Sequence, residues 1–170
     1  MKNSTLFKAL SVFIAAFPEN PTKNEHKSMY VFLRSVVRIV DSPHATRTMR
    51  RIKEPSMSAV KSRTAISMWM LANCKLWVYA EELIDEPKLW GPIVWAFLHE
   101  LAPFFEVSKK RIFADLIYSM GLVLPCRKCG RKFETLLNMK DVRRRWLNIQ
   151  TKRGNNDFFS FLHSRVNAHR

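Results

Sequence analysis

Apolar residues recur at intervals of three and four along almost the whole chain, and sustained strict alternation is scarce. This spacing places apolar side chains on one face of an α-helix, whereas a half-buried strand would alternate them. The sequence therefore predicts an all-α fold. Proline residues divide the pattern, and we expect helices over residues 4–17, 27–40, 57–84, 92–105, 109–123, 126–138, 142–148 and 157–168.

Composition narrows the class of protein further. Of the 170 residues, 47% are apolar, including 12 Phe and 5 Trp, which is enough for a packed core. Only 4 Gly are present, which argues against a turn-rich all-β fold and against a glycine-rich phosphate or dinucleotide loop. No apolar run reaches the ~18 residues of a membrane-spanning helix, so we expect no membrane span.

The formal net charge of +15 is spread along the chain rather than gathered in a tail. A positive field favours anionic partners such as nucleic acid or acidic proteins. A solvated basic surface explains the same charge, and charge alone does not specify a function. A basic helical module that binds nucleic acid or an acidic protein is therefore kept as the alternative function, with its cysteines structural.

The first residues combine basic and apolar side chains as a signal peptide does. Lys2 and Lys8 are followed by the apolar segment 9–17, and then by Pro18-Glu19-Asn20 instead of a small-x-small cleavage site. We therefore expect an ordinary amphipathic first helix. These residues do not settle the compartment, and an intracellular location is only the favoured alternative.

Two cysteines stand in the segment Pro125-Cys126-Arg127-Lys128-Cys129. Cysteines at this spacing form a disulfide within one helical turn or supply two zinc ligands. A helix starting at Pro125 would place Cys126 at the positive end of the helix dipole. That position, together with the neighbouring Arg and Lys residues, stabilises a thiolate and makes the pair redox-competent.

Zinc would need two more ligands, and His163 and His169 are suitably separated by five residues. However, 33 residues lie between Cys129 and His163, against roughly 12–15 in a zinc finger. We therefore expect no metal.

Two apolar helices each carry an aromatic residue and a histidine. Trp95 and His99 are four residues apart and share one face, while His163 and Asn167 lie on an apolar stripe of the last helix. A lone histidine on such a face is usually a hydrogen-bonded core residue. Because both helices repeat the combination around a redox cysteine pair, it suits a flat heteroaromatic cofactor.

Three segments carry a family resemblance: Leu-Trp-Gly-Pro-Ile-Val-Trp-Ala-Phe-Leu-His at 89–99, Leu-Pro-Cys-Arg-Lys-Cys at 124–129, and Phe-Leu-His-Ser-Arg-Val-Asn at 161–167. In this order, and with these gaps, they resemble the FAD-linked sulfhydryl oxidases of the Erv/ALR type. The resemblance covers residues 88–170 and implies a bundle of about four to five helices that binds FAD. It implies that the catalytic Cys126 and Cys129 exchange disulfides with protein dithiols, with Cys129 nearest the flavin and molecular oxygen as the acceptor.

The resemblance also implies a set of residues that contact FAD. They are Trp90, Gly91, Pro92, Trp95, His99, Cys129, His163, Val166, Asn167 and Arg170. One departure from the family is Ser164, which stands where its members usually have Asn after the histidine. Another is the lone Cys74, because family members often carry a second, shuttling cysteine pair.

Residues 1–87 match no known motif and are expected to form a smaller helical domain ahead of the oxidase domain at 88–170. Some oxidases of large DNA viruses have a similar layout, which suggests a viral protein in an infected cell or a virion. Because 1–87 contain only Cys74, they cannot hold a shuttle pair. We expect this domain to be structural or partner-binding, and we expect a homodimer.

Overall fold

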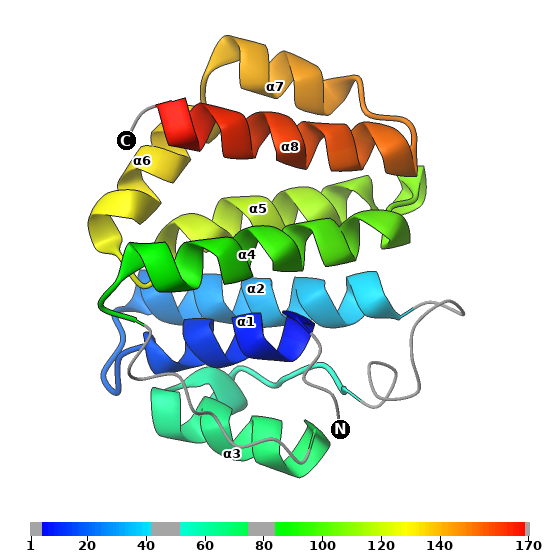
Figure 1. The fold of residues 1–170 in the computed structure, drawn as a ribbon. Helices are drawn as coiled ribbons and strands as arrows, with labels where there is room; N and C mark the ends of the chain where they lie inside the picture. Colours follow the sequence, from blue (N-terminus) through cyan, green and yellow to red (C-terminus); the bar gives the residue numbers. More distant parts are fainter. Residues whose placement is uncertain (1–4, 42–51, 75–83, 169–170) are drawn as a thin grey trace.

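The computed structural model describes residues 5–41, 52–74 and 84–168, and every regular element in these ranges is a helix (Figure 1). The all-α prediction is confirmed. The α-helices are α1 (Thr5–Ala15), α2 (Lys23–Val40), α3 (Arg63–Cys74), α4 (Pro87–Leu101), α5 (Lys110–Val123), α6 (Arg127–Leu137), α7 (Lys140–Leu147) and α8 (Lys152–Ala168). Three 3-10 turns connect them: η2 (Ser58–Val60), η4 (Ala102–Phe104) and η5 (Val107–Lys109).

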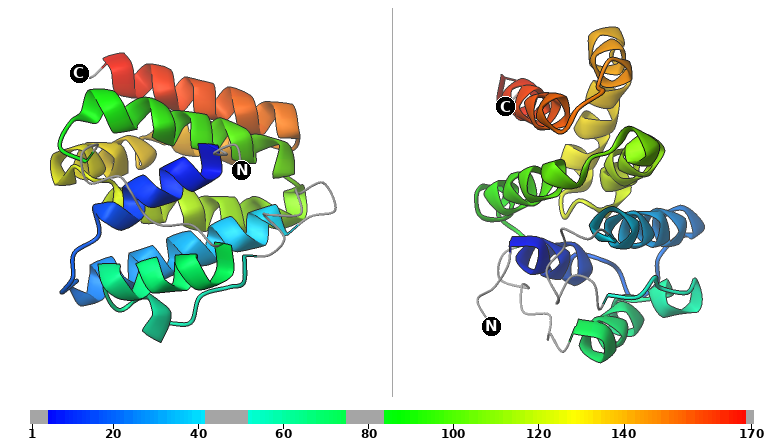
Figure 2. Two further views of the ribbon diagram at one scale, coloured as in Figure 1. Left: turned by 60° about the horizontal axis from the view of Figure 1, so that its bottom comes forward. Right: turned by 90° about the vertical axis from the view of Figure 1, so that its right-hand side faces the viewer.

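The helices stack in layers, as Figures 1 and 2 show. α1 and α2 form one layer, with α3 on its outer side, and α4 and α5 form the middle layer. α7 and α8 lie beyond the middle layer, and α6 leads from α5 toward them. The middle layer is therefore covered on both sides, which explains why α4 and α5 bury so many large apolar side chains.

One hydrophobic cluster runs through all these layers. Phe13 of α1, Phe32 of α2 and Phe97 of α4 meet within it, with ring centroids 4.6 to 6.0 Å apart. All three rings are fully buried. The helices before residue 87 and those after it therefore share a core, and a domain boundary at residue 87 stays a prediction.

Two consecutive lysines tie the start of α5 to neighbouring helices. The Lys109 ammonium donates to the carbonyls of Ile39 and Asp41 at the end of α2, at 3.2 and 2.9 Å. The Lys110 ammonium donates to the carbonyl of Leu147, the last residue of α7, at 2.7 Å. Helix C-termini carry unpaired carbonyls and partial negative charge, so cations are favourable there.

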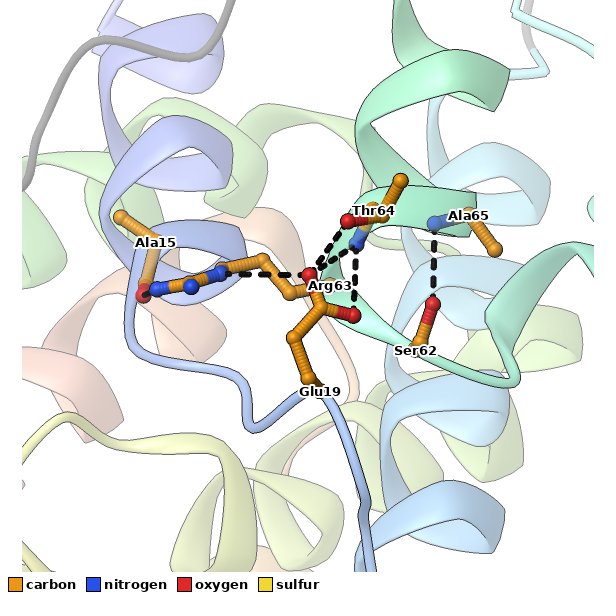
Figure 3. Close-up of polar contacts among 6 residues, drawn as sticks. All are labelled: Ala15, Glu19, Ser62, Arg63, Thr64 and Ala65. Carbon is orange, nitrogen blue, oxygen red and sulfur yellow. Dashed lines mark hydrogen bonds and ion pairs between the residues drawn. The ribbon is translucent and has the colours of Figure 1, made fainter.

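The loop between α1 and α2 fixes the start of α3 through Glu19 (Figure 3). The Glu19 carboxylate accepts hydrogen bonds from the backbone N–H of Thr64, at 3.1 Å, and from the Thr64 hydroxyl. Arg63 pairs with the same carboxylate at 3.8 Å and donates to the Ala15 carbonyl at 3.5 Å. The Thr64 hydroxyl is the main reason that the pKa of Glu19 lies below its ordinary value.

Two predicted helix starts were wrong because capping side chains extend the helices. α2 begins at Lys23 rather than at residue 27, because Thr22 and Glu25 form a reciprocal capping box. α8 begins at Lys152 rather than at residue 157. There the Thr151 hydroxyl accepts from the backbone N–H of Gly154 at 3.0 Å, so a polar first turn becomes helical.

Proline and serine explain the other two corrections. α4 begins at Pro87, not at Pro92, because proline fits the first helical position. Pro92 lies inside the helix, where it is exposed and its missing N–H removes one intrahelical hydrogen bond. The helix expected over 57–84 is divided into η2 and α3, since the Ser62 hydroxyl accepts from the backbone N–H of Ala65 at 3.1 Å and begins a new helix. Residues 75–83 lie outside the described part of the chain.

Candidate active site

Cys126 and Cys129 form a disulfide at the N-terminus of α6. Cys126 is the N-cap residue, and its sulfur accepts a hydrogen bond from the backbone N–H of Cys129 at 3.1 Å. Once the disulfide is reduced, this N–H and the helix dipole both stabilise a thiolate at Cys126. Arg127 and Lys128, which lie between the cysteines, are exposed and add positive charge. The site therefore favours the anionic form that thiol–disulfide exchange requires.

A cavity of about 410 Å³ opens beside the disulfide. Its size falls within the range of about 300–1,000 Å³ that small-molecule sites occupy. Four helices and the α5–α6 loop contribute the lining, which is mostly apolar: Pro87, Lys88, Trp90, Gly91, Val94, Trp95, Leu98, Met120, Leu124, Cys129, Lys132, Phe133, Leu136 and Val166. Of the two cysteines, Cys129 lines the cavity and Cys126 does not.

The close approach of α5 and α6 positions Cys129 in this wall. A Cβ atom on Gly130 would lie 2.0 Å from the backbone oxygen of Gly121, closer than atoms can pack. Only glycine at position 130 lets the two backbones come this near. The contact holds Cys129 and Phe133 against the side of the cavity formed by Met120.

α4 supplies half of the lining residues, and most of these follow helical spacing. Trp90, Val94 and Leu98 recur every four residues, and Gly91 and Trp95 do the same. The Trp90 side chain is buried, with 6% exposure for the residue, yet its Nε1 has no hydrogen-bond partner. Buried N–H donors are normally paired, so this indole is suited to donate to a ligand atom in the cavity.

α4 and α8 meet through their aromatic and histidine side chains. Trp95 and His163 stack with ring centroids 4.4 Å apart and an angle of 12° between the ring planes. His99 and Asn156 share a hydrogen bond of 2.7 Å between Nδ1 and Oδ1, in which the ring nitrogen donates because an amide oxygen accepts. The two histidine-bearing helices predicted from the sequence therefore lie side by side.

The residues expected to contact FAD divide into four groups. The cavity is lined by Trp90, Gly91, Trp95, Cys129 and Val166. His163 lies next to it through its stack on Trp95. The cavity lining does not include Pro92, His99 or Asn167, and Arg170 lies outside the described residues. The roles of all these residues toward a cofactor stay predictions.

Sequence reasoning missed several lining residues. Phe133 and Leu136 follow Cys129 at helical spacing, so the pattern of α6 contained a usable signal. Lys88 and Lys132 also line the cavity and place two cations beside it. Met120 of α5 had no such signal, since it reaches the cavity only through the packing of α5 on α6.

An acidic residue from the first half of the chain reaches the redox turn, the segment from Cys126 to Cys129 that holds the disulfide. The Arg127 guanidinium donates to the Glu25 carboxylate at 2.8 Å. Hydrogen bonds from Thr22, above all from its backbone N–H, hold the pKa of Glu25 below its ordinary value, and Arg127 contributes to this shift. Glu25 is therefore ionised at neutral pH.

Two further observations concern metal binding and membrane spans. Within residues 5–41, 52–74 and 84–168, no three His, Cys, Asp or Glu side chains gather closely enough to hold a metal ion. The helices in these ranges are also too short or too polar to cross a membrane.

Comparisons with known proteins give one informative match. No protein-family model matches the chain, and no solved structure matches it. A curated protein of Invertebrate iridescent virus 3, named "Putative FAD-linked sulfhydryl oxidase 096R", is 28% identical over 87 residues. The match covers 49% of this chain and 57% of that relative's length. This chain is therefore similar, over about half of its length, to a protein that is named as a sulfhydryl oxidase.

Proposed function

We propose that this chain is an FAD-dependent sulfhydryl oxidase that forms disulfides in protein substrates. The observation that carries the proposal is the position of Cys129, which belongs to a disulfide at a helix N-terminus and lines an apolar cavity. Trp90 and Trp95 form part of the same cavity wall. A redox cysteine beside a cavity with aromatic and apolar walls suits a flat redox cofactor.

The residues of the cavity fit a flavin. Trp90, Trp95 and Val166 offer apolar surface for a ring system, and the unpartnered Trp90 Nε1 offers a hydrogen-bond donor to its polar edge. Lys88 and Lys132 supply positive charge that suits a ligand carrying phosphates. When bound, FAD supplies the acceptor for the electron pair of the reduced cysteines and the oxygen chemistry that yields hydrogen peroxide.

Thiol–disulfide exchange at the cysteines accounts for the substrate step. A substrate thiolate attacks the Cys126 sulfur, a new substrate–Cys126 disulfide forms, and Cys129 leaves as a thiolate. The second substrate thiolate then attacks the substrate sulfur of that mixed disulfide and releases Cys126 as a thiolate. The substrate dithiol has lost two electrons and two protons, and the cysteine pair has gained two electrons.

The structure supports this order of attack through the different surroundings of the two sulfurs. Cys129 lines the cavity, whereas Cys126 caps the helix and is not part of the lining. When Cys126 is released, its thiolate accepts the hydrogen bond that Cys129 N–H already makes to its sulfur. Charge-assisted hydrogen bonds of this kind are stronger than neutral ones, so this contact stabilises the Cys126 thiolate in the reduced state.

Cysteine variants test the proposal directly. Purified protein should take up FAD and consume oxygen with a small dithiol. Cys126→Ser and Cys129→Ser should each abolish oxygen consumption while keeping the helical circular dichroism spectrum. Cys74→Ser is the matched control and should keep most activity, because that cysteine has no second thiol in the first half of the chain.

Two results would count against the proposed function. Folded, colourless protein that takes up no added FAD would contradict the cofactor assignment. Loss of activity in Cys74→Ser protein that still binds FAD would contradict the electron path. The homodimer, the intracellular location and the role of residues 1–87 stay predictions, which sedimentation and localisation experiments address.

A further inference from the structure

The N-terminus of α2 lies beside the redox turn. Arg127 follows Cys126 directly in the chain, and its Nη2 lies 2.8 Å from Glu25 Oε1. The Glu25 side chain is only 13% exposed, whereas that of Arg127 is 79% exposed. The carboxylate is therefore the fixed partner, and the arginine extends over the surface to reach it.

Glu25 is held in place by a second set of contacts. Its Oε2 accepts from the backbone N–H and from the hydroxyl of Thr22, both at 2.8 Å. The Thr22 hydroxyl in turn accepts from the backbone N–H of Glu25 at 3.3 Å, which completes the capping box of α2. One carboxylate thus caps a helix of the first half of the chain and pairs with the redox turn of the second half.

The charge of this pair bears on the chemistry of the cysteines. A cation next to a cysteine stabilises its thiolate, and a stabilised thiolate makes the reduced form of a cysteine pair more stable. Arg127 is such a cation, because it directly follows Cys126 at the start of α6. A carboxylate bound to Arg127 cancels part of its field at the sulfur.

We propose that Glu25 is a positioning residue of the redox turn: by holding and partly neutralising Arg127, it keeps the Cys126–Cys129 pair a weaker oxidant than its basic surroundings alone would make it. This inference rests on the proposed function, because it concerns a cysteine pair that is reduced and reoxidised. It assigns residues 1–87 a direct influence on the redox chemistry, beyond covering the oxidase helices.

A substitution that removes the charge and keeps the cap tests this role. Gln serves as well as Glu at the third position of a capping box, so Glu25→Gln removes only the charge. We expect this variant of the full chain to shift the glutathione equilibrium about 1.4- to fivefold toward the reduced pair, as a surface ion pair is worth ~0.2–1 kcal/mol. At about 30 mV per tenfold, the reduction potential would rise by about 4–20 mV. The measurement is mass spectrometry of the alkylated peptide that contains both cysteines.

Three further variants show whether the effect acts through Arg127. Arg127→Gln should shift the equilibrium toward the disulfide, and in that background Glu25→Gln should lose most of its effect. Thr22→Ala weakens the cap but keeps both charges and the backbone N–H that binds the Glu25 carboxylate, so it should lower the melting temperature and leave the equilibrium unchanged.

The proposed role of Glu25 is overturned by any of three results. These are an unchanged equilibrium in folded Glu25→Gln protein, an equal shift with and without Arg127, and the same shift in Thr22→Ala. The oxidase proposal fails separately, when the wild-type pair does not exchange with glutathione or the wild-type protein consumes no oxygen with a dithiol.

Discussion

Adding one methyl group at Gly130 should disrupt the packing of the candidate active site. In Gly130→Ala, the new Cβ would meet the backbone oxygen of Gly121 at 2.0 Å. A backbone carbonyl within a helix cannot rotate away, so α5 and α6 must separate. Because Cys129 precedes this glycine, the disulfide and the cavity wall move with α6.

The expected loss of stability follows from two opposing effects. Alanine favours the helix by ~1 kcal/mol relative to glycine. Overpacking costs about 1–3 kcal/mol, and a clash with backbone belongs at the upper end of that range. The free energy of unfolding should therefore fall by about 2 kcal/mol. For a chain of this size, that lowers the melting temperature by about 4–8 °C.

Gly121→Ala, on the facing helix, is the matched control. The nearest atom to its new Cβ is Cγ of Glu134 at 3.4 Å, which is ordinary contact with an exposed, flexible side chain. This variant gains helix propensity without a clash, so its melting temperature should stay the same or rise by a few degrees, ~2–4 °C at most.

Thermal unfolding followed by far-UV circular dichroism measures both variants, and titration with FAD reports on the cavity. We expect Gly130→Ala to bind FAD more weakly than Gly121→Ala. A Gly130→Ala protein as stable as the wild type would refute the close approach of the two backbones. An equal fall in melting temperature in both variants would contradict the prediction that only the Cβ at position 130 clashes with backbone.

Three other predictions concern the cavity, the shared core and the ionised carboxylates. Trp90→Phe removes the unpartnered Nε1 donor, so FAD affinity measured by fluorescence should fall up to about tenfold, the value of one hydrogen bond, with the fold retained. A fragment of residues 88–170 should show no cooperative melting, because Phe97 loses its contacts with α1 and α2; a fragment that melts cooperatively and binds FAD would contradict this. A hydrogen bond from the Arg38 side chain is the main reason that the pKa of Glu54 lies below its ordinary value of 4.5. That pair therefore stabilises the fold above about pH 4.5 and loses its effect as the pH falls, so Glu54→Gln should flatten the acid side of a plot of melting temperature against pH.

Local spacing along the chain was enough to predict the helical class and the cysteine turn. Apolar residues at intervals of three and four predict the all-α class, and the same rule places Trp95 and His99 on one face of a helix. Trp90 and Gly91 were expected near a cofactor only from the family resemblance, because the predicted helix began after them, at residue 92. The cysteine spacing after Pro125 likewise places Cys126 at a helix N-terminus. These features depend only on residues within one or two turns of each other, so they can be derived without the tertiary structure.

Helix starts were harder to predict from the sequence, although the signals that set them are also local. The Thr22 and Glu25 pair is a readable capping box, and Thr151 is a readable N-cap, but both are followed by polar residues that carry no apolar periodicity. Proline at position 87 and proline at position 92 look alike in sequence. Only the structure shows which of the two occupies the first turn.

The tertiary structure alone decided which helices meet around the disulfide. Glu25 and Arg127 are 102 residues apart, and no local pattern pairs them. The contact between Gly121 and Gly130, and the stack of Trp95 on His163, likewise join separate helices. Periodicity determines which face of a helix is apolar, but the partner that covers that face depends on how side chains from distant segments fill the same space at close-packed density.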